Sequence, residues 1–180
     1  MISALPNVIT LGRLLSVPLL AILLSSHDYQ LAFWFFLVLG LSDGLDGYIA
    51  RRFNAITQAG TLLDPVADKL LVITSASFLV WDGLLPMWIG VPLVLRDVAM
   101  LSAGLLDSNL RDNPITPNSW GKSHAAFAFL AIGVAIGQAA DLFYNEWFSQ
   151  VIWFVLLATL CITSVVYCFE WRRFHAERKA

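Results

Sequence analysis

The chain has 180 residues, of which 58% are hydrophobic and only 13% are charged, and its mean hydropathy is +0.73. These values exclude an ordinary soluble domain, and the length fits one membrane domain spanning residues 1–180. With 11 basic against 13 acidic residues there is no basic surface of the kind that binds nucleic acid, so no nucleic-acid partner is expected.

Six apolar segments follow one another along the chain, each with about the 20 residues that a helix needs to cross a hydrocarbon core of ~30 Å. Polar turn sequences such as SSHDYQ and WDGLLP separate them. The sequence therefore predicts an all-α integral membrane protein with six transmembrane helices. The predicted helices are Leu5–Leu24, Leu31–Ala50, Gly60–Val80, Pro86–Leu106, Trp120–Ala140 and Trp147–Phe169.

The basic residues predict how this bundle is oriented. With six spans, both termini lie on one side of the membrane, together with the second–third and fourth–fifth connections. That side holds eight of the eleven basic residues: Arg51, Arg52, Arg111, Lys122, Arg172, Arg173, Arg178 and Lys179. The connections on the other side contain no Lys or Arg but carry Asp28, Asp82, Asp141 and Glu146. By the positive-inside rule both termini are cytoplasmic. The absence of an Arg-rich, acid-poor transit peptide favours a bacterial inner (plasma) membrane.

Polar residues interrupt the first apolar segment at three-residue steps. Asn7, Thr10 and Arg13 argue against a cleavable signal peptide, which has an unbroken apolar centre. They could instead line a cavity. For Arg13 the alternative is a side chain that extends to the membrane interface.

Four aspartates fall within 26 residues around the second–third connection. Asp43 and Asp46 end the second predicted helix, and Asp64 and Asp68 begin the third. Spacings of three and four residues place each pair on one helical face, and both pairs flank the same cytoplasmic connection. A carboxylate at membrane depth costs at least a few kcal/mol. We therefore expect these acids to be neutralised together by cations.

Two facing acidic pairs are the hard oxygen ligands that Mg²⁺ and Mn²⁺ prefer. Two metals about 4 Å apart clamp a pyrophosphate and stabilise an in-line displacement. Gly47, Ala50 and Gly60 leave space for a ligand beside the acids, although small residues also allow close helix packing. Arg51 can bind a phosphate through its planar guanidinium. These residues predict a metal-dependent enzyme of phosphoryl-type transfer with two divalent cations.

The pattern Asp43-x2-Asp46-Gly47-x2-Ala50-Arg51-x8-Gly60-x3-Asp64-x3-Asp68 resembles the signature of the CDP-alcohol phosphatidyltransferase family at every fixed position. The resemblance covers essentially the whole chain. It implies a homodimer of six-helix protomers, each with a single polar cavity open to the cytoplasmic side. It implies that the four aspartates are metal ligands, that Asp68 is also the general base, and that Gly47, Ala50, Arg51 and Gly60 bind the CDP group.

The resemblance also suggests the substrates. CDP-diacylglycerol is the usual donor of the family in bacteria, and the opening LPNVITLGR is similar to that of its glycerophospholipid synthases, which implies that Asn7 and Thr10 contribute to the CDP site. The resemblance implies direct displacement. Asp68 takes the proton of the acceptor hydroxyl, the oxygen attacks the β-phosphorus, and CMP leaves.

The acceptor is predicted from two further segments. Leu95-Arg96-Asp97-Val98 and Pro117-x4-Lys122 resemble cardiolipin synthases, whereas Ser119–Lys122, read SWGK, resembles phosphatidylglycerophosphate synthases. Phosphatidylglycerol is preferred as acceptor over glycerol-3-phosphate. Arg96, Lys122 and Arg13 are the candidates to bind the acceptor phosphate. The structural alternatives are an ion pair of Arg96 with Asp97 and an interfacial Lys122.

A different class of function is also weighed, because an ion or proton transporter would also keep acids inside a helix bundle. A transporter would not need Gly47, Ala50, Arg51 and Gly60 at these spacings. Among the remaining polar residues, Lys69 is expected to balance the acidic cluster, with donor phosphate binding as the alternative. His124 is expected to be a solvated or interfacial histidine, and the alternative is that it approaches a site near Lys122. Cys161 and Cys168 lie too far apart on one helix for a disulfide and are expected to be inert.

Overall fold

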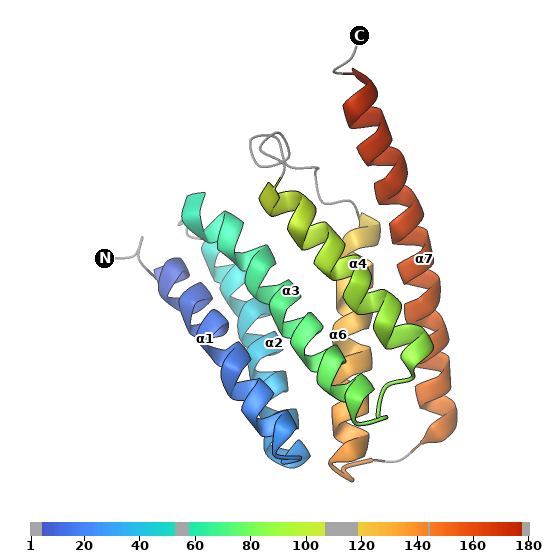
Figure 1. The fold of residues 1–180 in the computed structure, drawn as a ribbon. Helices are drawn as coiled ribbons and strands as arrows, with labels where there is room; N and C mark the ends of the chain where they lie inside the picture. Colours follow the sequence, from blue (N-terminus) through green and yellow to red (C-terminus); the bar gives the residue numbers. More distant parts are fainter. Residues whose placement is uncertain (1–4, 53–57, 107–118, 144, 178–180) are drawn as a thin grey trace.

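A computed structural model shows a bundle of long helices (Figure 1). It describes residues 5–52, 58–106, 119–143 and 145–177, and the side chains of residues 12–42, 66–103, 121–143 and 145–172. Within these ranges the chain forms six α-helices and no strand. They are α1 (Leu5–Ser25), α2 (Tyr29–Arg52), α3 (Gln58–Trp81), α4 (Met87–Leu106), α6 (Ser119–Ala139) and α7 (Glu146–Glu177).

Successive helices run in opposite directions, so their ends gather at two opposite ends of the bundle (Figure 1). The motif end is where α2 finishes at Arg52 and α3 starts at Gln58; α1 and α6 also start there, and α4 and α7 finish there. The far end carries the short connections 26–28, 82–86 and 140–145. This alternation brings the two halves of the aspartate motif to one end of the molecule.

The far-end connections are short because three helices end in the same backbone motif. At the ends of α1, α3 and α6 one residue adopts a left-handed conformation: His27 (φ 57°), Gly83 (φ 74°) and Asp141 (φ 54°). In each case this amide and the next bond back to carbonyls three and five residues earlier, as from His27 to Leu24 and from Asp28 to Leu23. This is the Schellman arrangement, which satisfies the last helical carbonyls.

Side-chain caps begin the helices that follow two of these connections, α2 and α7. The Asp28 carboxylate accepts a hydrogen bond from the Leu31 amide at 3.2 Å, and Asn145 caps α7 in the same way through the Phe148 amide at 3.0 Å.

A side-chain contact joins two of these connections. The Tyr29 hydroxyl donates a hydrogen bond to the Asp82 carboxylate at 3.1 Å and lies 2.7 Å from His27 Nδ1. Burial, the hydrogen bond to Asp82 and the charge of Asp82 together raise the pKa of Tyr29 to about 12. The phenol therefore remains a donor at neutral pH and ties the α1–α2 connection to the α3–α4 connection.

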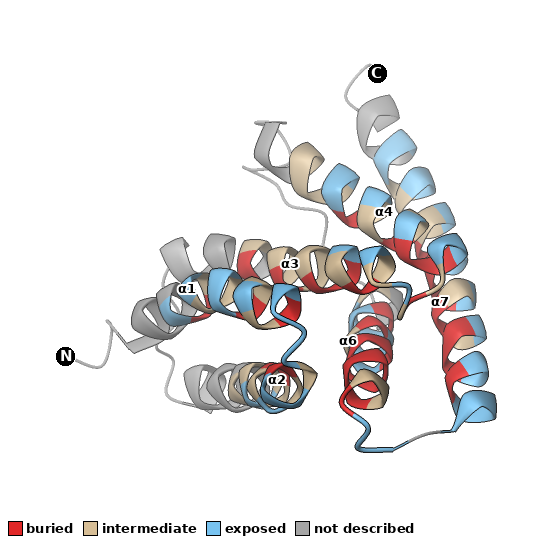
Figure 2. Ribbon diagram, turned by 60° about the horizontal axis from the view of Figure 1, so that its bottom comes forward, coloured by how far each residue is buried: buried red, intermediate tan, exposed pale blue. Residues whose placement is uncertain are grey.

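The core is centred on α6, which packs against α2, α3 and α7. Residues 131–137 of α6 are all buried, as the red segment of α6 in Figure 2 shows. Small residues permit this, since helices in a membrane associate through close packing rather than through exclusion of water. On α2, Gly40 lies directly against the Phe129 ring, which stacks on Phe36 with ring centroids 4.2 Å apart.

The predicted helix bounds agree with the structure to within two residues, except at the end of α7. The apolar run stops at Phe169, but the helix continues to Glu177. The added segment, EWRRFHAE, contains residues with good helix propensity, and long basic side chains can leave a membrane while the backbone stays helical.

Hydropathy alone does not identify all the spans. Among the described residues, one stretch is long and apolar enough to cross a membrane, Glu146–Arg172 of α7. The apolar parts of α1 and α2 found within the described side chains, Gly12–Ser25 and Tyr29–Ser42, are shorter. The remaining transmembrane spans therefore stay a prediction.

Candidate functional site

The predicted motif divides between two helices that meet at the motif end. Asp43, Asp46, Gly47, Ala50 and Arg51 lie on α2, within its last three turns. Gly60, Asp64 and Asp68 lie on α3, within its first three turns. Asn7 and Thr10 lie in the first two turns of α1. Apart from Asp68, the side chains of all these residues lie outside the described ones, so their predicted roles stay predictions.

The structure pairs two of the predicted site residues. Arg13 of α1 donates a hydrogen bond from Nη1 to Oδ1 of Asp68 on α3, at 2.8 Å. The Arg13 side chain is 5% exposed and the Asp68 side chain 48% exposed. Arg13 therefore does not extend to the membrane interface, which was the structural alternative for this residue. It lies inside the bundle, where its charge neutralises the predicted base, whose side chain is half exposed.

The described residues are compatible with a divalent cation, although they do not themselves form its site. Among the side chains that the structure describes, no three His, Cys, Asp or Glu residues are arranged to hold a metal. Asp68 is a hard oxygen donor of the right kind, and its side chain is half exposed. Its three predicted partners, Asp43, Asp46 and Asp64, fall outside the described side chains.

A second ionic cluster lies between α3 and α4, one residue along the chain from Asp68. Oδ1 of the buried Asp97 accepts hydrogen bonds from Arg96 Nη1 at 2.7 Å and from Lys69 Nζ at 3.2 Å. The Arg96 guanidinium also lies over the Tyr167 ring of α7, 5.8 Å from its centroid. Lys69 thus has a partner, Asp97, that sequence reasoning missed. For Arg96 the alternative of an ion pair with Asp97 is the arrangement seen.

Lys122 and His124, two residues apart on α6, differ in environment. Lys122 is exposed near the motif end. His124 is only 2% exposed, and its Nδ1 lies 3.2 Å from the Thr159 hydroxyl of α7. The expectation of a solvated or interfacial histidine was wrong. The error arose because α6 is central in the bundle, which buries the face that carries His124.

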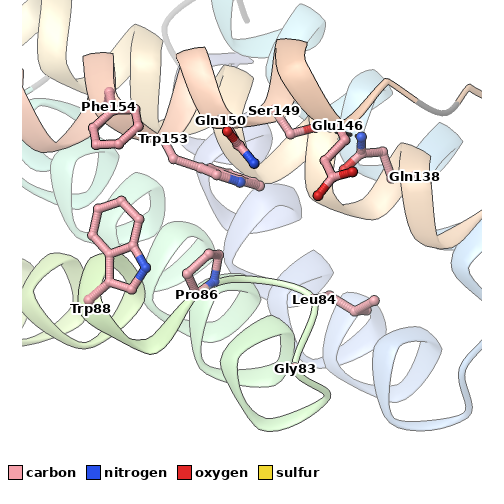
Figure 3. A pocket seen from close by; sticks show the side chains of 10 residues that line it. All are labelled: Gly83, Leu84, Pro86, Trp88, Gln138, Glu146, Ser149, Gln150, Trp153 and Phe154. Carbon is pink, nitrogen blue, oxygen red and sulfur yellow. Dashed lines mark hydrogen bonds between the residues drawn. The ribbon is translucent and has the colours of Figure 1, made fainter.

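A pocket of about 530 Å³ opens at the far end, away from the aspartates (Figure 3). The first turns of α7 contribute Glu146 and the aromatic rings of Trp153 and Phe154, and Trp88 of α4 faces them. This pocket is distinct from the predicted cavity, which should open at the motif end. No described residue of the predicted site lines it.

Comparison with known proteins gives several relatives of similar identity. The chain is 30% identical over 183 residues to a cardiolipin synthase (CMP-forming) / mitochondrial hydrolase fusion protein of Schizosaccharomyces pombe, covering 93% of the chain but 31% of that protein. It is 39% identical over 102 residues to a cardiolipin synthase (CMP-forming) of Streptomyces coelicolor, covering 53% of the chain and 47% of that protein. The chain thus spans a third to a half of the length of these relatives.

A third relative matches along nearly its whole length. This is a CDP-diacylglycerol–glycerol-3-phosphate 3-phosphatidyltransferase of Aquifex aeolicus, 30% identical over 166 residues, which cover 90% of the chain and 92% of that protein. The family model described as CDP-alcohol phosphatidyltransferase matches residues 3–169. This match includes every helix with the exception of the last eight residues of α7. The chain therefore belongs to the CDP-alcohol phosphatidyltransferase family.

Proposed function

We propose that this protein transfers a phosphatidyl group from CDP-diacylglycerol to an alcohol acceptor and releases CMP. The observation that carries the proposal is the fixed motif at the junction of α2 and α3, with its last aspartate, Asp68, half exposed and held by the buried Arg13. The family match and the named activities of the relatives support it. A transporter would give no reason for the glycines and Arg51 at these spacings.

Asp43, Asp46, Asp64 and Asp68 would hold two divalent cations, Mg²⁺ or Mn²⁺. Bound there, the cations would neutralise the charge of the diphosphate. Gly47, Ala50, Arg51 and Gly60 would bind the CDP group, together with Asn7 and Thr10. Asp68 would take the proton of the acceptor hydroxyl while the oxygen–phosphorus bond forms and the bond to CMP breaks.

Arg13, Arg96 and Lys122 are proposed to attract the acceptor phosphate. In the substrate-free protein Asp68 and Asp97 hold these two arginines, so a phosphate would share or replace a carboxylate partner.

We propose a homodimer with both termini in the cytoplasm of a bacterial cell and the catalytic cavity open to that side. A cysteine introduced at Lys122 should react with a membrane-impermeant maleimide only after permeabilisation, whereas one at Ser26 should react in intact cells.

Phosphatidylglycerol is the proposed acceptor, and glycerol-3-phosphate is the second candidate. Relatives carrying each name match the chain at similar identity, so the assay must separate the two. Purified protein is supplied with CDP-diacylglycerol and one acceptor at a time, and the lipid product is identified by mass. Cardiolipin from phosphatidylglycerol, with no product from glycerol-3-phosphate, would support the first candidate. Phosphatidylglycerophosphate alone would establish the second.

A further inference from the structure

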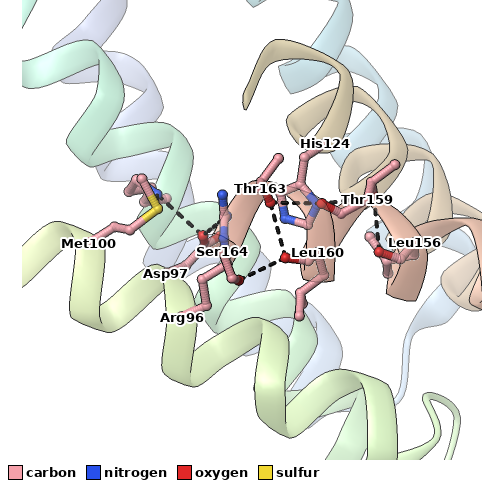
Figure 4. A network of polar contacts seen from close by, with 10 residues as sticks. Arg96, Asp97, Met100, His124, Leu156, Thr159, Leu160, Thr163 and Ser164 are labelled. Carbon is pink, nitrogen blue, oxygen red and sulfur yellow. Dashed lines mark hydrogen bonds and ion pairs between the residues drawn. The ribbon is translucent and has the colours of Figure 1, made fainter. Parts of the chain in front are cut away.

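A buried histidine, His124, lies on α6 against α7, and Figure 4 draws it together with Arg96 and Asp97 of the second ionic cluster. His124 projects from α6 toward α7, and the charges of Arg96, Asp97 and Lys69 are those that act on its ring. Because a charged side chain this deeply buried is costly, the imidazole is neutral and carries a single proton.

Hydrogen bonds on α7 determine which ring nitrogen carries that proton. The Thr159 hydroxyl donates to the Leu156 carbonyl at 2.9 Å, so its one hydrogen is already used. In its contact with His124 Nδ1 at 3.2 Å the hydroxyl oxygen must therefore accept, which makes Nδ1 the donor. It follows that Nε2 is a bare lone pair and can only accept a hydrogen bond.

Neither His124 Nε2 nor Arg96 Nε has a hydrogen-bond partner, although both atoms are buried. Leaving a buried polar atom without a partner is costly, so its presence calls for a ligand or a water. The two atoms have opposite needs, since Nε2 requires a donor and the Arg96 N–H requires an acceptor. A hydroxyl would supply the donor that Nε2 lacks, and a phosphate oxygen would supply the acceptor that the Arg96 N–H lacks.

We propose that His124 recognises a hydroxyl group of the acceptor alcohol, through a hydrogen bond from that hydroxyl to Nε2. This inference rests on the proposed function and identifies the group that binds beside the phosphate. The glycerol unit of either candidate acceptor has two free hydroxyls, of which one attacks and the other is spare. Asp68 would act on the attacking hydroxyl. The spare one, on the neighbouring carbon, would bond to His124.

The test uses an acceptor that lacks only the spare hydroxyl. Purified protein is assayed with CDP-diacylglycerol and either phosphatidylglycerol or its phosphatidyl-1,3-propanediol analogue. If glycerol-3-phosphate proves to be the active acceptor, it is compared instead with 3-hydroxypropyl phosphate. The wild-type protein should prefer the hydroxylated acceptor by about tenfold in kcat/KM. This is the effect of one hydrogen bond, because the analogue leaves His124 Nε2 without a donor. His124→Phe should abolish this preference and raise the acceptor KM, with the KM of CDP-diacylglycerol unchanged.

Two further variants complete the design. Ser75→Ala removes a hydroxyl on α3 that is also buried without a hydrogen-bond partner, and this variant should keep the wild-type preference. Thr159→Val leaves His124 in place but frees its proton to move to Nε2, so it should reduce the preference to about threefold and serves if His124→Phe does not fold.

The outcomes separate the two proposals. If the wild-type protein releases CMP while folded His124→Phe and Thr159→Val keep the full preference, the role of His124 is overturned and the proposed function stands. A buried water would then satisfy Nε2. No CMP release by the wild-type protein with any acceptor would overturn the proposed function and this inference with it.

Discussion

At the scale of single residues, the chemistry depends on charges that hold one another inside an apolar bundle. Arg13 and Asp68 lie 55 positions apart in the chain and meet because α1 packs against α3. Asp97 likewise accepts from two cations. Breaking one partner of a buried pair is costly because the other charge is left uncompensated. Each of these cations is therefore held by a specific carboxylate, and removing that carboxylate would leave its charge uncompensated.

Asp68→Asn should reduce CMP release by about 10²–10⁴-fold, the usual contribution of a general base, while much of the binding of CDP-diacylglycerol remains. Asp82→Asn is the matched control, because Asp82 lies at the far end and bonds to Tyr29; it should leave turnover unchanged. Turnover is followed by CMP release and donor binding by calorimetry. If Asp68→Asn loses donor binding as severely as Asp43→Asn does, Asp68 is chiefly a metal ligand.

Some residue positions in the candidate site could be predicted from the sequence, whereas contacts between helices could not. The three-residue steps of the first helix predicted that Arg13 could line a cavity, and the structure places Arg13 inside the bundle, bonded to Asp68. The burial of His124 and the Lys69–Asp97 pair could not be predicted, because both depend on which helices are neighbours. The presence of an acid directly after Arg96 was the available signal for the second ionic cluster.

At the scale of the helices, length and hydropathy predict the segments well but not their packing. The six predicted segments became helices with nearly the predicted bounds. Hydropathy does not reveal that α6 is the central helix, since an apolar helix can face lipid or protein equally well. Its seven consecutive buried residues, 131–137, become understandable only from its contacts with α2, α3 and α7.

The contact between α2 and α6 is testable at Gly40. A methyl group there would overlap the Phe129 ring, which cannot easily move because it stacks on Phe36. Gly40→Ala should destabilise the protein by about 1–3 kcal/mol, the usual cost of overpacking, and should also reduce activity because Asp43 lies one turn further along α2.

Gly133→Ala is the control, since its methyl group would lie at an ordinary 3.6 Å from Phe36. Thermal melting in detergent compares the variants. Equal melting temperatures for the two alanine variants would show that the α2–α6 contact is looser than described.

The left-handed residues at the far-end helix ends give two predictions with opposite effects on stability. Gly83 has φ 74° and free space beside it, so Gly83→Ala should destabilise the protein by about 1–2 kcal/mol through the backbone alone. Asp141 adopts the same conformation with a side chain, and Asp141→Gly should remove that strain and raise the melting temperature. A lower melting temperature for Asp141→Gly would contradict the shared end motif.

At the scale of the whole molecule, the chain separates a motif end, which has the aspartates, from a far end, which has compact connections and an acidic surface. The positive-inside rule predicts that the motif end faces the cytoplasm. In a membrane protein with this orientation, the four acids would lie next to lipid headgroups rather than deep in hydrocarbon, which would explain why an apolar chain carries them.

The central claim is a metal-dependent phosphatidyl transfer, and CMP release by the purified protein tests it most directly. Protein stripped with EDTA is supplied with CDP-diacylglycerol and phosphatidylglycerol or glycerol-3-phosphate, and Mg²⁺ or Mn²⁺ is then added back. We predict no CMP without metal, release that rises with metal concentration, and no release by Asp43→Asn under any of these conditions. Equal release in EDTA, or no release with either acceptor and either metal, would contradict the account.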